Sequence, residues 1–96
     1  MMALYVYIVT SRANTTLYTG VTDDLERRLY QHRHNIVPGF SSRHRIDKLV
    51  YYEYIPDVAA AEARMEEIRN WPRRQKVALI VRENPEWRDL AKEWVS

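Results

Sequence analysis

The sequence predicts an α/β (α+β) domain, a small three-stranded antiparallel sheet flanked by helices, in the order strand, strand, helix, strand, helix, helix, helix. Two N-terminal segments alternate with a period of two, and most of the remaining chain has helical periodicity. There is no internal repeat, linker or low-complexity tract, and 46% hydrophobic residues are enough for one core. Residues 1–96 are therefore expected to form a single domain.

The first two strands are predicted over residues 4–9 and 17–21. Leu4, Val6 and Ile8 alternate with Tyr5, Tyr7 and Val9, and Leu17, Thr19 and Val21 alternate with Tyr18 and Gly20. This period of two is typical of strands with one face buried. The link at 11–15 is short and polar, so it favours an antiparallel hairpin.

Tyr7 and Tyr18 have the same parity as Gly20 if the aliphatic positions face the main core. A glycine inside a strand marks a bulge or a close approach, here with room for a substrate. Packing is the alternative role for both tyrosines, because tyrosine is common in strands.

The first helix is predicted over residues 24–34. Asp23 followed by Glu26 resembles a capping box. In this helix Leu25, Leu29 and His32 fall at helical spacing. Residues 35–45 have the composition of a basic loop, and 48–55 that of the third strand.

Proline residues divide the remaining chain into three predicted helices. The first begins at Pro56-Asp57 and ends near Trp71-Pro72, and the second begins at Pro72. The apolar stripe of the first is Val58, Ala61, Met65 and Ile68, and the inward positions of the second are Val77, Ile80 and Val81. After Asn84-Pro85, a last amphipathic helix is expected to carry Trp87, Leu90, Ala91 and Trp94.

The charge of the chain is concentrated in two basic segments. No acid occurs from Arg27 to Ile46 or from Ile68 to Arg82. Two such segments around one cleft would attract phosphate, and two solvated surfaces are the alternative. The candidate nucleic-acid-binding residues are Arg27, Arg43, Arg45, Arg69, Arg73, Arg74 and Lys76.

Compositional features also bear on the cellular location of the chain. The absence of cysteine excludes disulfides and thiolate zinc sites, so a metal would need oxygen or imidazole ligands. No segment is long and apolar enough for a membrane span, and no leader pattern is found. A soluble, cytoplasmic protein is expected.

Arg28 and His32 lie at the border of the buried face of the first helix, whereas Arg27 points to solvent. Their i, i+4 spacing lets the two side chains converge on one anion. A partly buried guanidinium needs an acceptor, which is either phosphate or a carboxylate such as that of Asp24. For His32, a neutral, hydrogen-bonded core position is the alternative.

These residues together resemble a known family. Val6-Tyr7-Ile8, Tyr18-Thr19-Gly20 and residues 25–29 with His32 are similar to the GIY-YIG nuclease motifs. Further similarity to the small stand-alone bacterial subgroup lies at 39–40, 49–53, Trp71, 76–80 and 84–90, so that it covers nearly the whole chain.

The resemblance implies a three-stranded antiparallel sheet with helices and hydrolysis of nucleic-acid phosphodiesters, with DNA as the expected substrate. It implies a divalent cation, Mg or Mn, as cofactor. Tyr7 would be a general base or would position the attacking water, and Tyr18 would assist it. Arg28 would stabilise charge on the phosphate, and His32 would hydrogen-bond within the cluster.

One departure from the family concerns the metal. The resemblance places the metal-binding glutamate of the family at Met65, and methionine is a poor ligand for Mg or Mn. Glu62 is the better surrogate and Glu66 the second, with surface pairing to Arg69 or Arg73 as their alternative role.

Three hypotheses follow. The first is a metal-dependent endonuclease directed by backbone or shape, and the second is a nucleic-acid-binding module with little catalysis. The third is a protein-interaction domain that uses the face of Trp87 and Trp94.

Overall fold

A computed structural model describes residues 4–34 and 46–92. It contains β1 (Leu4–Thr10), β2 (Leu17–Thr22), α1 (Leu25–Arg33), β3 (Lys48–Ile55), α2 (Val58–Arg69) and α3 (Arg73–Glu83). The first six predicted elements and their order are confirmed.

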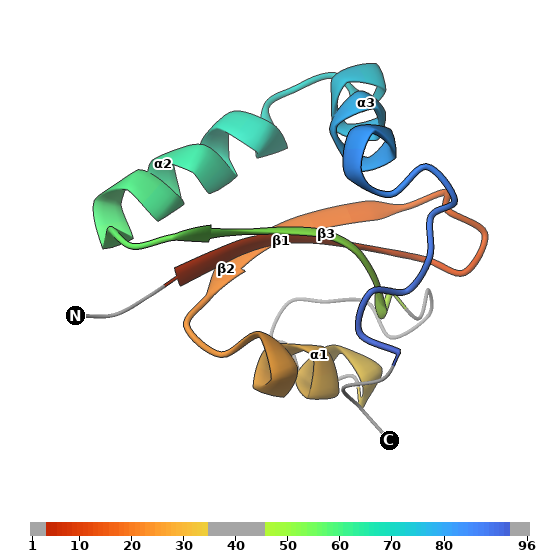
Figure 1. The fold of residues 1–96 in the computed structure, drawn as a ribbon, viewed down its shortest axis with the longest axis horizontal. Coiled ribbons are helices and arrows are strands. Elements are labelled where there is room, and N and C mark those ends of the chain that lie inside the picture. The colour runs from red at the N-terminus through yellow and green to blue at the C-terminus, as the bar shows by residue number, and fades with distance from the viewer. Residues whose placement is uncertain (1–3, 35–45, 93–96) are drawn as a thin grey trace.

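The strands form one antiparallel sheet with β1 in the centre and the order β2-β1-β3. Helix α1 covers one face of the sheet, while α2 and α3 cover the other (Figure 1). The register of β1 against β3 shifts between Ile8 and Val9, where Ile8 pairs with Tyr51 and Val9 with Leu49. The extra residue, Val50, forms a bulge, and as a result Val50 and Tyr51 both pack on the α2 and α3 face.

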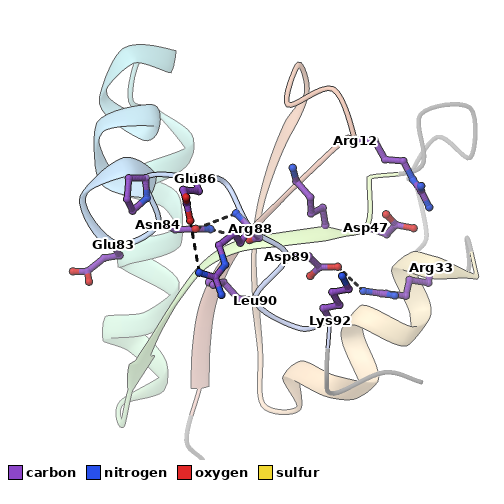
Figure 2. A pocket seen from close by; sticks show the side chains of 12 residues that line it. Arg12, Arg33, Asp47, Glu83, Asn84, Glu86, Arg88, Asp89, Leu90 and Lys92 are labelled. Carbon is purple, nitrogen blue, oxygen red and sulfur yellow. Dashed lines mark hydrogen bonds and ion pairs between the residues drawn. The ribbon is translucent and has the colours of Figure 1, made fainter.

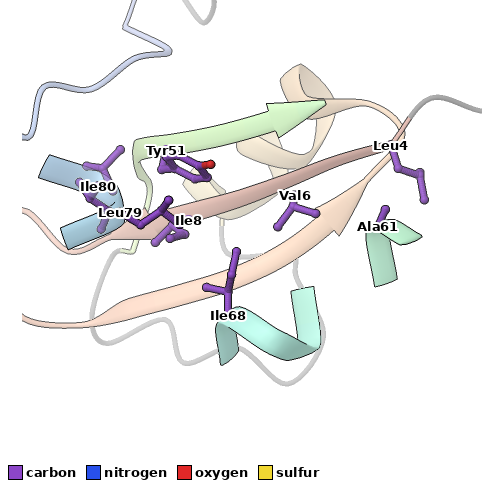
Figure 3. Close-up of a cluster of buried hydrophobic side chains, with 9 residues drawn as sticks. Leu4, Val6, Ile8, Tyr51, Ala61, Ile68, Leu79 and Ile80 are labelled. Atoms are coloured by element: carbon purple, nitrogen blue, oxygen red, sulfur yellow. The ribbon is translucent and has the colours of Figure 1, made fainter. Parts of the chain in front are cut away.

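The two faces of the sheet bury separate clusters, as the parity of the strands predicts. The cluster under α2 and α3 consists of Leu4, Val6, Ile8, Val50, Tyr51, Ala61, Ile68, Leu79 and Ile80 (Figure 3). The cluster under α1 consists of Tyr7, Val9, Leu25, Leu29, Ile46, Leu49 and Ala91. Tyr7 and Tyr18 therefore lie on the α1 face, away from the larger cluster.

Helix α1 begins one residue later than the predicted capping box implies. Its N-cap is Asp24, whose carboxylate accepts a hydrogen bond from the Arg27 backbone amide at 3.0 Å. The Thr22 hydroxyl accepts from the Asp24 backbone amide at 3.1 Å. These bonds join the end of β2 directly to α1, and fix the position of α1 beneath β1 and β2.

Two predicted inward positions on the other helices are wrong. Val58 is 44% exposed because it lies in the first turn of α2, beyond the edge of the buried cluster. Val81 is 38% exposed, whereas Leu79 and Ile80 are buried. The apolar stripe of α3 is therefore rotated toward Leu79.

The predicted last helix is absent from residues 84–92, where the chain forms turns joined by irregular backbone. A helix would place Trp87, Leu90 and Ala91 on one face. Instead, Trp87 packs against the cluster under α2 and α3, while Leu90 and Ala91 pack against the cluster under α1. The segment passes the end of the sheet (Figure 1), and its Leu90 amide donates to the Leu49 carbonyl at 2.8 Å. Trp94 lies outside the described residues.

A membrane-spanning helix is not found within residues 4–34 and 46–92, where every helix is too short or too polar.

Candidate functional site

The Tyr7 ring lies directly over the backbone of Gly20, its partner on β2. A Cβ atom at position 20 would be 2.5 Å from the Tyr7 hydroxyl oxygen and 2.6 Å from Cζ. The room that glycine provides is thus filled by Tyr7 and not left for a substrate. Glycine is required here because any larger residue would displace the tyrosine.

Tyr7, Tyr18 and His32 form a compact aromatic cluster between β1, β2 and α1. The Tyr7 hydroxyl and His32 Nε2 are 3.0 Å apart and hydrogen-bonded. The Tyr18 ring centroid is 5.4 Å from that of His32 and 6.3 Å from that of Tyr7. Tyr7 and His32 are buried, whereas Tyr18 is partly exposed. The three side chains that the motif pattern predicted to act together therefore do lie together.

Arg28 joins this cluster from α1, where its guanidinium lies close enough to the Tyr7 hydroxyl to lower the pKa of that group. Arg27 points away, with a 65% exposed side chain that pairs with Asp23 at 3.6 Å and Asp24 at 3.8 Å. Within the described ranges, no carboxylate lies within ion-pair distance of Arg28. The predicted helix phase is confirmed, and Asp24 pairs with Arg27 rather than with Arg28.

The buried groups of the cluster are electrically neutral. Burial raises the pKa of Tyr7, and the neighbouring Tyr18 adds to the rise, while the positive charges of Arg28 and Arg69 oppose it. Burial also lowers the pKa of His32 from 6.5 to about 4, and the nearby Arg28 charge lowers it further. At neutral pH the cluster thus presents a phenol and an uncharged imidazole beside a guanidinium.

Of the predicted phosphate-binding residues, only Arg69 reaches the cluster among those described. Arg73 donates instead to the backbone carbonyls of Asn14 at 2.7 Å and Thr15 at 2.9 Å, and so stabilises the β1-β2 turn. Arg74 is exposed on α3 and Lys76 is half-buried. Arg43 and Arg45 lie outside the described residues.

The residues near the cluster offer few ligands for a divalent cation. In the described part of the chain, no three His, Asp or Glu side chains form a metal-binding group. Met65 packs against the cluster under α2 and α3. Glu62 is exposed, and the Glu66 carboxylate lies 3.4 Å from Arg69. This donor set fits Mg only as a single carboxylate supplemented by substrate phosphate and water, an arrangement that Mg accepts.

A broad hollow of about 1330 Å³ lies elsewhere, between the end of α1, the start of β3 and residues 83–92 (Figure 2). The residues that line this hollow include both basic and acidic side chains, and some of them pair with one another. Arg33 donates to Asp89 at 2.9 Å, and Arg88 lies 3.7 Å from Glu86. Because neither sign of charge dominates, this hollow is a poorer phosphate site than the tyrosine cluster, despite its size.

Two features of the cluster were not predicted from the sequence. One is the packing of Tyr7 over Gly20, although their shared parity was a correct indication that they face the same side. The other is the inclusion of Arg69 in the cluster. Arg69 belongs to a helix on the opposite face of the sheet, and no local pattern indicates that its side chain crosses the sheet edge.

Comparison with known proteins identifies the family of the chain. Residues 3–78 match the GIY-YIG catalytic domain. A UPF0213 protein of Clostridium perfringens is 34% identical over 76 residues, which cover 79% of this chain and 81% of that protein. A UPF0213 protein of Staphylococcus haemolyticus is 36% identical over 76 residues, covering 79% and 92%.

The fold also has a solved counterpart. The solution NMR structure of a UPF0213 protein from Bacillus halodurans has a TM-score of 0.60 and 24% identity, and the alignment covers 99% of this chain and 100% of that one. From the domain match and these relatives, the chain belongs to the GIY-YIG family, within its UPF0213 group.

Proposed function

We propose that this protein hydrolyses phosphodiester bonds of nucleic acid, with DNA as its substrate, at the cluster of Tyr7, Tyr18, Arg28 and His32. The observation that carries the proposal is the 3.0 Å hydrogen bond between Tyr7 and His32, with Arg28 beside it. Among the described residues, Arg28 has no carboxylate partner. A guanidinium in that position needs an anionic acceptor. The match to a catalytic domain of nucleases supports phosphate as that anion.

The solvent exposure of the four side chains indicates which of them can contact the substrate. Tyr18 and Arg28 are partly exposed, so we assign direct contact with the substrate to them. Arg28 would stabilise the charge that develops on the phosphate oxygens, because a planar guanidinium matches them with two parallel hydrogen bonds. Preorganised donors of this kind supply much of the rate acceleration in phosphoryl transfer.

Tyr7 and His32 are buried and pack against the two partly exposed residues. Tyr7 is completely buried and its pKa is raised, so its hydroxyl is protonated at neutral pH. A protonated phenol orients water or a neighbouring side chain and does not remove a proton. We therefore assign an orienting role to Tyr7, held in place by His32 Nε2 and by the close contact with Gly20.

A divalent cation, Mg or Mn, is the proposed cofactor. Glu66, or Glu62 one turn earlier, would be its protein ligand, and phosphate oxygens and water would complete the coordination. When bound, the cation would supply additional positive charge to stabilise the negative charge that develops on the phosphate oxygens. The small number of basic and polar groups around the cluster supports recognition of the backbone or of nucleic-acid shape over recognition of bases.

The proposal is tested with labelled single-stranded, duplex and branched substrates, each incubated with Mg, with Mn and with EDTA. We expect metal-dependent cleavage of at least one substrate by the wild type and none by Arg28→Ala. The Arg28→Ala protein must retain the wild-type circular dichroism spectrum. Cleavage that survives Arg28→Ala would place the active site elsewhere.

A second function, nucleic-acid binding without efficient cleavage, is favoured by Met65. This residue packs against the hydrophobic cluster where the family resemblance predicts a carboxylate. A thioether there adds apolar packing but no hard oxygen ligand. In the same assay, this function predicts binding to the substrates without cleavage in any metal.

A further inference from the structure

Arg69 reaches across the edge of the sheet. It belongs to α2, which covers one face, yet its guanidinium lies beside Tyr18, whose side chain belongs to the other face. Arg69 Nε donates to the Thr19 carbonyl at 3.1 Å, and Arg69 Cζ lies 5.8 Å from the centroid of the Tyr18 ring. Because β2 is an edge strand, the side chain can pass around it without entering the core.

These contacts place a second positive charge at the tyrosine cluster. Arg69 and Arg28 both act on the Tyr7 hydroxyl, one from α2 and the other from α1. Tyr18 lies beside Arg69, Tyr7 and His32. Two guanidinium groups from opposite faces of the sheet therefore converge on the same partly exposed edge.

The negative charge available to these two arginines is small. Among the described residues, Arg69 has one carboxylate partner, Glu66, at 3.4 Å, and the Glu66 side chain is 60% exposed. Arg28 has none within residues 4–34 and 46–92, and His32 and Tyr7 are neutral. The site thus keeps an excess of positive charge, which suits the single negative charge of a phosphodiester.

We propose that Arg28 and Arg69 form a clamp that binds one phosphate of the nucleic-acid backbone across the Tyr18 edge, and that this capture requires no divalent cation. The bond to Thr19 uses Nε of Arg69, and the long contact with Glu66 uses one of its two terminal nitrogens. A guanidinium has five N–H donors in a fixed plane, so these nitrogens can exchange the long contact with Glu66 for phosphate oxygens. The clamp rests on the proposed function for the identity of its ligand. Capture by the two arginines needs no cation, whereas the proposed hydrolysis does, so the two can be tested separately.

The test measures binding of a fluorescein-labelled DNA duplex in EDTA over a series of salt concentrations. Arg69→Met is compared with Arg82→Met, which removes the same charge from a 69% exposed position on α3. We expect Arg69→Met to weaken binding about tenfold, the scale of one charge-assisted hydrogen bond, and to reduce the salt slope by about 0.9. Arg82→Met should leave the affinity within about twofold and the slope unchanged.

A double-mutant cycle tests whether both arginines bind the same phosphate. If they do, Arg28→Met and Arg69→Met together should weaken binding by less than the product of the two single effects. Equal affinities of Arg69→Met and Arg82→Met, or strictly multiplicative effects in the cycle, would overturn the clamp.

Glu66→Gln provides a variant that leaves the Arg69 bond to Thr19 intact, in case Arg69→Met does not fold. Removal of the competing carboxylate should strengthen binding in EDTA by up to about fivefold, the upper limit for an exposed ion pair. Unchanged or weaker binding contradicts the clamp.

The clamp and the proposed hydrolysis can be refuted separately. Wild type that binds in EDTA but never cleaves with Mg or Mn would refute hydrolysis alone. Wild type that binds DNA only with a cation would refute the clamp alone.

Discussion

Gly20→Ala is expected to destabilise the protein through Tyr7. The new Cβ atom would lie 2.5–2.8 Å from three atoms of the Tyr7 side chain, whereas ordinary contacts between such atoms begin near 3.5 Å. The ring must move by about 1 Å, a displacement large enough to break its 3.0 Å bond to His32.

Three contributions determine how much Gly20→Ala should change the free energy of unfolding. Overpacking costs about 1–3 kcal/mol and the lost buried hydrogen bond about 1 kcal/mol. The reduced freedom of the unfolded chain returns about 0.4–1 kcal/mol. The free energy of unfolding should therefore fall by about 1–4 kcal/mol, and the melting temperature by at least about 4 °C for a domain of this size. Urea denaturation measures the first quantity and calorimetry the second.

Tyr7→Leu supplies the matched background, because leucine has no ring over position 20. There, Gly20→Ala should be neutral or stabilising by about 0.5–1 kcal/mol, since alanine is ordinarily better than glycine in a strand. If Gly20→Ala is equally destabilising in both backgrounds, the contact with Tyr7 is not the cause, and the Tyr7 ring does not require glycine at position 20.

Three further predictions concern the cluster and the segment after α3. Arg28→Ala should lower cleavage at least about 100-fold, whereas Arg27→Ala, at an exposed and already paired position, should change it only modestly. Equal effects in the cleavage assay would contradict the helix phase. Because the folded pKa of His32 is about 4 and the unfolded value is 6.5, only the unfolded state gains its proton between these pH values. The free energy of unfolding should therefore fall by about 3 kcal/mol as the pH is lowered from 6.5 through 4, and urea denaturation of His32→Phe should lack that component. Asp89→Ala should cost about 1–3 kcal/mol in the same measurement, because it removes the bonds to Arg33 and to two backbone amides. Glu86→Ala, at an exposed position, should stay within about 0.5 kcal/mol.

Local periodicity was sufficient to predict most of the fold. Alternation in β1 and β2 predicted which side chains share a face, and the 100° step of α1 separated Arg28 from Arg27. These predictions succeeded because each depends on the geometry of one element and on its hydrophobic partition.

The failures concern segments whose structure depends on contacts between elements. Trp87 and Leu90 have helical spacing, but the chain there must connect the two faces of the sheet. Asn84 fixes that path, because its side-chain amide donates to the Val50 and Arg88 carbonyls and its oxygen accepts from the Arg88 amide. Spacing alone cannot distinguish this crossing from a helix. Nor can it indicate that Arg69 passes around β2, since that contact joins residues 50 positions apart.

Met65→Glu distinguishes the two proposed functions. If the remaining site is assembled and lacks only a hard ligand, an added carboxylate should raise cleavage in Mg or Mn, because it would help to hold the cation near the substrate phosphate. Met65 is partly buried against the hydrophobic cluster under α2 and α3, so an unpaired carboxylate also carries a desolvation cost of about 1–3 kcal/mol. Melting must therefore be measured beside activity.

Glu62→Gln and Glu66→Gln complete the comparison. If either glutamate already supplies the ligand, its glutamine variant should lose cleavage while binding in EDTA persists, and Met65→Glu should add little. If no metal ligand exists, both glutamine variants should resemble the wild type in metal-dependent assays. Suppose that all three variants fold and bind DNA, and that neither they nor the wild type cleaves any substrate in Mg or Mn. Hydrolysis is then refuted, and the positive charge of Arg28 and Arg69 is left to serve binding alone.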